Sequence, residues 1–100
     1  MPYKVTLAAQ GDIEDIIATI WQENPKAAET VEDRLYAAFD LLAENPGLGH
    51  ERSDLTDLPV LFWPIQQTNY AAIYRKASLI EIIRVIHWRR DIPAVLSRDV

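Results

Sequence analysis

A run of nine residues near the C-terminus, Leu79–His87, carries mainly apolar side chains on both faces that a β-strand would present. Side chains alternate between the two faces of a regular strand. One face would hold Ile80, Ile82, Arg84 and Ile86, and the other Leu79, Glu81, Ile83, Val85 and His87. A strand of this kind must be covered on both faces, so the fold needs a layer on each side of its sheet.

Two further strands are predicted just before this run, at Val60–Gln66 and Tyr70–Lys76. The segments between the three strands are short, which is typical of hairpins, so the three form an antiparallel meander. Pro64 has no backbone N–H to donate, which favours an edge position or a bulge for the first of them. At the N-terminus, Tyr3–Leu7 alternates apolar and polar residues and is predicted to be a strand.

Two helices are predicted between the N-terminal strand and the meander. From Asp12 the apolar residues follow a helical period, with acidic residues in the first turns. The expected stripe comprises Ile13, Ile16, Ile17, Ile20 and Trp21. Asn24-Pro25 ends this helix, and Pro25 suits the first position of the next.

The second helix is predicted over Pro25–Glu44, where Asn45-Pro46-Gly47 stops it. Its expected buried stripe comprises Ala28, Val31, Leu35, Phe39 and Leu42. The two helices form a hairpin that covers one face of the sheet, which gives a single α+β domain over residues 1–100. A short helix over Asp91–Leu96 covers part of the second face, and we expect a partner chain to close the rest.

The composition excludes several classes of protein. The chain has no cysteine, so disulfides and thiolate metal sites are excluded. No segment approaches the roughly 20 apolar residues needed to span a bilayer, and a cytoplasmic, non-membrane protein is expected.

Charge is distributed unevenly along the chain, whose formal net charge is −5. Residues 1–73 contain four Lys and Arg against twelve Asp and Glu, whereas residues 74–100 contain six against three. An acidic chain is poorly suited to nonspecific phosphate contacts, so direct DNA binding by this chain alone is not expected. A local basic patch fits a specific anionic partner, or merely solvates the edges of the sheet.

His87 is the obvious candidate for a general acid or base, because histidine titrates near neutral pH. The alternative is a hydrogen-bonded histidine at a strand end. His50 lies in a loop and is expected to face solvent. The two histidines lack the spacing of a zinc site, and neither a metal nor another cofactor is expected.

Three arginines, Arg52, Arg75 and Arg84, are candidates for binding an anion, because a guanidinium is planar and always charged. Arg84 lies among isoleucines, where an unpaired charge would be costly. It therefore either faces an anion-binding groove or pairs internally with an acid such as Asp54 or Asp57. In a regular strand Arg84 and His87 lie on opposite faces, so a site that uses both requires a bulge or a strand end.

Four motifs, in this order and spacing, resemble the RelE/ParE superfamily of bacterial toxins, most closely its ParE branch. They are Pro46-Gly47-Leu48-Gly49, Arg52-Ser53-Asp54-Leu55, Tyr74-Arg75 and Ile83-Arg84-Val85-Ile86-His87-Trp88-Arg89-Arg90-Asp91. The resemblance extends over nearly the whole chain and implies the same α+β fold.

The resemblance implies a toxin of a type II toxin–antitoxin system that inhibits DNA gyrase by binding rather than by catalysis. It also implies a ParD-like, DNA-binding antitoxin encoded next to it, and a hetero-oligomer of the two. The target-binding candidates are Arg84, His87, Arg89 and Arg90, and the antitoxin-binding candidates are Arg52, Tyr74, Arg75, Ile80 and Ile82. The alternative is a ribosome-dependent mRNA endoribonuclease of RelE type, with Arg52, Arg75, Arg84 and His87 as its catalytic set.

Overall fold

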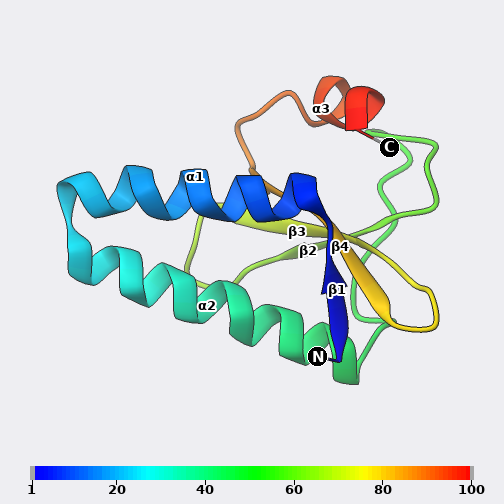
Figure 1. The fold of residues 1–100 in the computed structure, drawn as a ribbon. Coiled ribbons are helices and arrows are strands. Elements are labelled where there is room, and N and C mark those ends of the chain that lie inside the picture. Colours follow the sequence, from blue (N-terminus) through cyan, green and yellow to red (C-terminus); the bar gives the residue numbers. More distant parts are fainter. Residues whose placement is uncertain (1, 100) are drawn as a thin grey trace.

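The computed structural model describes residues 2–99, so Met1 and Val100 of the predicted domain lie outside it. Its elements run in the order of a strand, two helices, three strands and a short helix (Figure 1). They are β1 (Tyr3–Val5), α1 (Leu7–Glu23), α2 (Pro25–Glu44), β2 (Leu61–Pro64), β3 (Tyr70–Arg75), β4 (Ile80–His87) and α3 (Ile92–Asp99). The predicted α+β class and element order are confirmed.

All four strands form one mixed sheet in the order β1-β4-β3-β2. The pairs β2–β3 and β3–β4 are antiparallel, as the predicted meander requires. The N-terminal strand β1 pairs with β4 in the parallel sense, with Tyr3 opposite Ile80. Pro64 lies in β2, at the other edge of the sheet, where its missing N–H interrupts no ladder inside the sheet.

Helix α1 begins five residues before the predicted position at Asp12, and the strand before it is correspondingly shorter. Thr6 is its N-cap, and the Thr6 hydroxyl accepts a hydrogen bond from the backbone N–H of Ala9 at 3.1 Å. This bond satisfies one of the free N–H groups at the start of the helix. Asp12 consequently lies inside the helix rather than in its first turn, and is free for a different contact.

Helix α2 has the predicted bounds. Its N-cap is Asn24, whose side-chain oxygen accepts from the Ala27 N–H at 3.1 Å, and Pro25 occupies the first turn. At the other end the Asn45 N–H donates to the Leu41 carbonyl at 2.9 Å. Each cap depends only on residues that are close in the sequence. The sequence alone therefore predicts both ends of α2.

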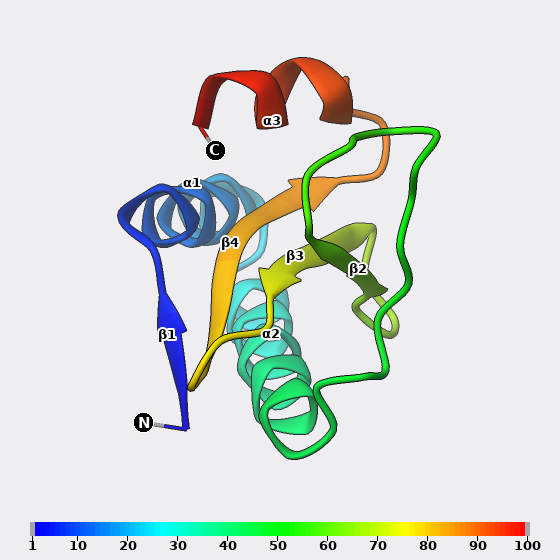
Figure 2. The same ribbon diagram turned by 90° about the vertical axis from the view of Figure 1, so that its right-hand side faces the viewer.

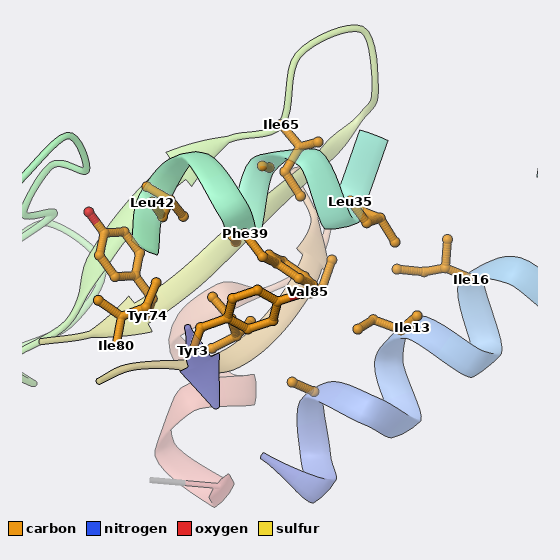
Figure 3. Close-up of a cluster of buried hydrophobic side chains, with 14 residues drawn as sticks. Tyr3, Ile13, Ile16, Leu35, Phe39, Leu42, Ile65, Tyr74, Ile80 and Val85 are labelled. Atoms are coloured by element: carbon orange, nitrogen blue, oxygen red, sulfur yellow. The ribbon is translucent and has the colours of Figure 1, made fainter. Parts of the chain in front are cut away.

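The main core lies between the helical hairpin and one face of the sheet (Figure 3). Phe39 of α2 is fully buried there, and its ring contacts that of Tyr3 edge-on, with 5.6 Å between ring centroids. From α1, Ile13 and Ile16 are buried in the same cluster, but Trp21 is 52% exposed. The prediction that Trp21 belongs to the buried stripe is therefore wrong.

The second face of the sheet is covered by the chain itself. A second apolar cluster joins side chains from the sheet, the loop before β2 and α3: Val60, Phe62, Ile73, Ile83, Ile86, Ile92, Val95 and Leu96. Figure 2 shows the loop rising from the end of α2 toward α3. The expectation that a partner must close this face is wrong, because α3 and the loop bury it.

No helix among residues 2–99 combines the length and the apolar character needed to cross a bilayer.

Candidate functional site

An ion pair between α1 and β4 lies at the centre of the candidate site. The Arg84 guanidinium donates from Nε to Oδ2 and from Nη2 to Oδ1 of Asp12, both at 2.7 Å. Asp12 Oδ2 also accepts from the backbone N–H of Val85 at 3.0 Å. The hydrogen bonds from Arg84 to Asp12 raise the pKa of Arg84, and burial partly offsets this effect.

Arg84 therefore forms an internal ion pair, one of the two alternatives predicted from its apolar surroundings. Its partner is Asp12 rather than Asp54 or Asp57. The pair forms because β4 extends beyond the end of β1. Beyond the end of β1, this edge of β4 forms hydrogen bonds with side chains at the start of α1. The Thr6 hydroxyl, for example, donates to the Ile83 carbonyl at 2.8 Å. The Ile83 carbonyl and the Val85 N–H of this edge thus have partners without a fifth strand.

A β-bulge in β4 changes which residues share a face. Ile73 is opposite Arg84, whereas the next residue of β3, Tyr74, is opposite Ile82, so Ile83 is the extra residue. Before the bulge Ile82 belongs to the core under the helices, and after it Val85 does. The regular alternation expected for Leu79–His87 is therefore wrong, because an extra residue shifts the strand by one position.

The bulge brings His87 to the same side of the sheet as α1. A hollow of about 220 Å³ opens between α1 and the end of β4. It is lined by Asp12, Asp15, Ile16, Thr19, Tyr70, Val85, His87 and Arg90. Arg84 and His87 thus approach one hollow, Arg84 through its partner Asp12 and His87 directly.

His87 is a hydrogen-bonded histidine at a strand end, the alternative that the sequence left open. Its Nδ1 accepts from the backbone N–H of Arg89 at 3.0 Å, and its carbonyl accepts from the N–H of Arg90 at 3.0 Å. Its ring packs edge-on against Tyr70, with 5.3 Å between centroids. These contacts shape the turn that follows β4.

The other two arginines of the proposed catalytic set lie elsewhere. Arg75 pairs with Glu81 at 3.0 Å, and the two residues are opposite each other in the β3–β4 ladder. His87 is opposite Tyr70 at the other end of that ladder, six residues along β4, which is about 20 Å at the rise of a strand. Arg75 and His87 therefore cannot contact the same substrate atom.

Arg52 pairs with Asp54 in the exposed loop before β2, at 2.8 Å. The hydrogen bond from Arg52 lowers the pKa of Asp54 and the same bond raises the pKa of Arg52. Each of the three arginines thus has its own carboxylate partner. Among the described residues, no three His, Cys, Asp or Glu side chains converge in a way that would hold a metal ion.

The turn after β4 is the exposed part of the site. Trp88, Arg89 and Arg90 are all exposed, and Arg90 also lines the hollow. The sequence identified the two arginines but not Asp12, Asp15, Tyr70 or Trp88. Spacing alone gives no signal for them, because the hollow joins α1 to strands that lie far along the chain.

Three of the residues predicted to bind an antitoxin are buried in the core below the helices: Tyr74, Ile80 and Ile82. Tyr74 has a structural contact instead, since its hydroxyl donates to the Pro46 carbonyl at 2.8 Å and accepts from the Gly49 N–H at 2.7 Å. In this conformation these three side chains are not available to a partner. Arg52 and Arg75 remain accessible.

Comparison with known proteins gives the fold a context. Nine chains among the solved structures are similar to this one. One of them, described as the chromosomal ParDE TA system from P. aeruginosa, has a TM-score of 0.72 and 21% sequence identity, covering 87% of this chain and 95% of that chain. A comparison with curated proteins finds no match. The model of the family described as ParE toxin of type II toxin-antitoxin system, parDE, matches residues 3–92. The chain therefore belongs to the ParE toxin family of type II toxin–antitoxin systems.

Proposed function

We propose that this toxin acts in the cytoplasm by binding DNA gyrase, without catalysis, and that a ParD-like antitoxin encoded next to it neutralises it. The antitoxin would supply the DNA binding of the pair and form a hetero-oligomer with this chain. A similar fold described as a ParDE system supports the pairing.

The observation that most supports a mechanism without catalysis is the separation of the candidate catalytic residues in space. A general acid or base must lie within hydrogen-bond reach of the proton that it transfers. Arg75 and His87 are at opposite ends of the β3–β4 ladder, and Arg52, Arg75 and Arg84 are each held by a carboxylate. A ribonuclease built from this set would have to break three ion pairs and bring distant ends of a sheet together.

The exposed turn after β4 supports a binding mechanism. Arg89 and Arg90 are exposed, and none of the ion pairs found among the described residues includes either of them. Exposed charges of this kind accelerate association with an oppositely charged surface more than they stabilise a fold. We assign Arg89 and Arg90 to the target surface, with Trp88 as an aromatic neighbour and His87 as the residue that shapes the turn.

The test compares the wild-type toxin with His87→Ala in two assays, DNA supercoiling by purified gyrase and cleavage of mRNA on ribosomes. We expect the wild type to inhibit supercoiling and to leave mRNA intact. His87→Ala should retain most of the inhibition, because it keeps Arg89 and Arg90 and also keeps the backbone carbonyl that accepts from the Arg90 N–H. Ribosome-dependent cleavage that falls about 100-fold in His87→Ala would overturn the proposal, since that loss is typical of a general acid or base.

A further inference from the structure

A groove of about 250 Å³ lies between α2 and the edge strand β2. Four residues of α2 and two residues in or just after β2 line it: Arg34, Ala37, Ala38, Leu41, Trp63 and Gln66. The four helical residues follow the spacing i, i+3, i+4 and i+7, so they form one side of the helix, about 10 Å long. Small-molecule sites usually enclose roughly 300–1,000 Å³, so this groove suits a small occupant.

Arg34 supplies a cation at one end of the helical side of the groove. It is half-buried within α2. The residues three and four positions away on its helix are all uncharged: Thr30, Val31, Ala37 and Ala38. None of the ion pairs found among the described residues includes Arg34, whereas the arginines of the loop before β2 and of the sheet each have a carboxylate. A guanidinium that is partly withdrawn from water and unpaired is well suited to bind an anion.

The opposite side of the groove supplies an indole and an amide. Trp63 of β2 is half-buried, and Gln66 is exposed in the turn that follows. This turn is held by Thr68, whose N–H and hydroxyl donate to the Ile65 carbonyl at 3.2 and 2.8 Å. Gln67 has a φ of 59°, a conformation that favours glycine at this position of a turn. Residues in such conformations cluster at ligand-binding sites, where the surrounding structure holds them in place.

The charge of the groove identifies the class of ligand. Arg34 is the one charged residue among those that line it. A phosphate monoester carries a charge of about −1.5 to −2 at neutral pH, more than one guanidinium neutralises. A carboxylate carries a single charge, and its two oxygens match the fork of a guanidinium. The indole of Trp63 and the alanines of α2 are suited to an apolar ring.

We propose that this groove binds a small aromatic carboxylate. The carboxylate pairs with Arg34, and the ring packs against Trp63 and Ala37. The Gln66 amide supplies a hydrogen-bond donor at the rim. None of the residues that line this groove lines the hollow beside His87, so the inference does not depend on the cellular target of the toxin.

The probes are naphthoate, naphthylmethylamine and naphthyl phosphate, which share an aromatic ring system and differ in charge. Each is titrated into the full-length toxin while NMR follows the indole N–H resonances. Trp21 and Trp88 are exposed, so Trp21→Phe and Trp88→Phe identify their own resonances and, by elimination, that of Trp63. Naphthoate should shift the Trp63 resonance with a dissociation constant of about 1 mM, which is ordinary for a ligand of this size. The amine and the phosphate should each bind at least about tenfold more weakly.

Two matched pairs of variants test the position of the ligand. Arg34→Gln should weaken naphthoate binding by at least about tenfold, whereas Lys26→Gln, which removes an exposed cation from the same helix, should change it less than about twofold. Ala37→Leu fills the groove and should weaken binding by a similar factor, whereas Ala18→Leu, at an exposed alanine of α1, should not. Thermal melts establish that each variant is folded.

Three results would overturn the inference. The first is a Trp63 resonance that naphthoate does not shift at about ten times the expected dissociation constant. The second is binding of the amine or the phosphate as tight as that of naphthoate. The third is equal binding by the two members of either pair of variants.

Discussion

Asp12 and Arg84 are 72 residues apart in the chain and are joined by two hydrogen bonds of 2.7 Å. The relative exposures of the two side chains are 12% and 10%, so water screens the pair little. Asp12 also accepts the Val85 N–H, which links the first long helix to both the side chain and the backbone of the central strand.

Asp12→Ala should lower the free energy of unfolding by about 3 kcal/mol, because it removes the carboxylate from a buried arginine and the acceptor from a strand N–H. Urea denaturation measures the change. Asp15→Ala, at an exposed position on the same helix, is the control and should stay within about 0.5 kcal/mol of the wild type. Equal stability of the two variants would show that the pair contributes nothing net.

Gly49→Ala should destabilise the chain by about 1–3 kcal/mol through overpacking. A Cβ at this position would lie 2.6 Å from Cε1 and from Oη of Tyr74 and 2.9 Å from Cβ of Leu61. Gly47→Ala is the matched control, because a Cβ there meets nothing within 4 Å. Thermal melts that shift by the same amount in both variants would contradict the close packing of Tyr74 against the loop.

Stability should decrease at alkaline pH. Burial raises the pKa of Tyr74 above its ordinary value of 10.0, although the hydrogen bond from Gly49 partly offsets this, and burial also raises the pKa of Tyr3. The unfolded chain therefore loses these protons first as the pH rises. The stabilisation is complete below pH 10.0 and is lost as the pH rises through the folded-state values.

Urea midpoints measured from about pH 8 to about pH 11 test this dependence, because the range spans the ordinary tyrosine pKa. Tyr74→Phe should be less stable at every pH, since it loses two hydrogen bonds, but its stability should fall less steeply above pH 10.0. An unchanged slope in this variant would exclude Tyr74 as a source of the effect.

Replacing Arg89 and Arg90 together by Glu should reduce toxicity by about tenfold by slowing association with the target. The free energy of unfolding should change by no more than about 0.5 kcal/mol, as for other surface substitutions. Lys4→Glu combined with Lys26→Glu makes the same charge change at exposed positions elsewhere and should remain fully toxic. If the two double variants are equally toxic in growth assays, the turn after β4 has no role in target binding.

The parts of the fold that were predictable from sequence depend on local interactions. Helix α2 was predicted with its observed bounds because Asn24-Pro25 and Asn45 supply its caps. The start of α1 was missed because Tyr3–Leu7 alternates like a strand, while the signal for the helix was a single threonine cap at Thr6. Around Thr6 the alternation of residues favours a strand, whereas the capping residue favours the start of a helix. The structure has the helix.

The candidate site was harder to predict because it depends on one extra residue in a strand. The alternation of Leu79–His87 gives no indication of a bulge at Ile83, and the bulge decides which side chains of β4 face α1. The requirement that Arg84 has an acidic partner followed from its apolar neighbours. The identity of that partner did not, since Asp12 comes from the opposite end of the chain.

The pairing of β1 with β4 also sets how early in synthesis this domain can complete its fold. Thr6 and Ile83 are in contact although 77 residues separate them. A ribosome adds about 5–20 residues per second, so β1 waits roughly 4 seconds or more for the strand beside it. During that interval the edge of the sheet at β1 has no strand to pair with. The sheet of this domain therefore cannot be completed until β4 has been synthesised.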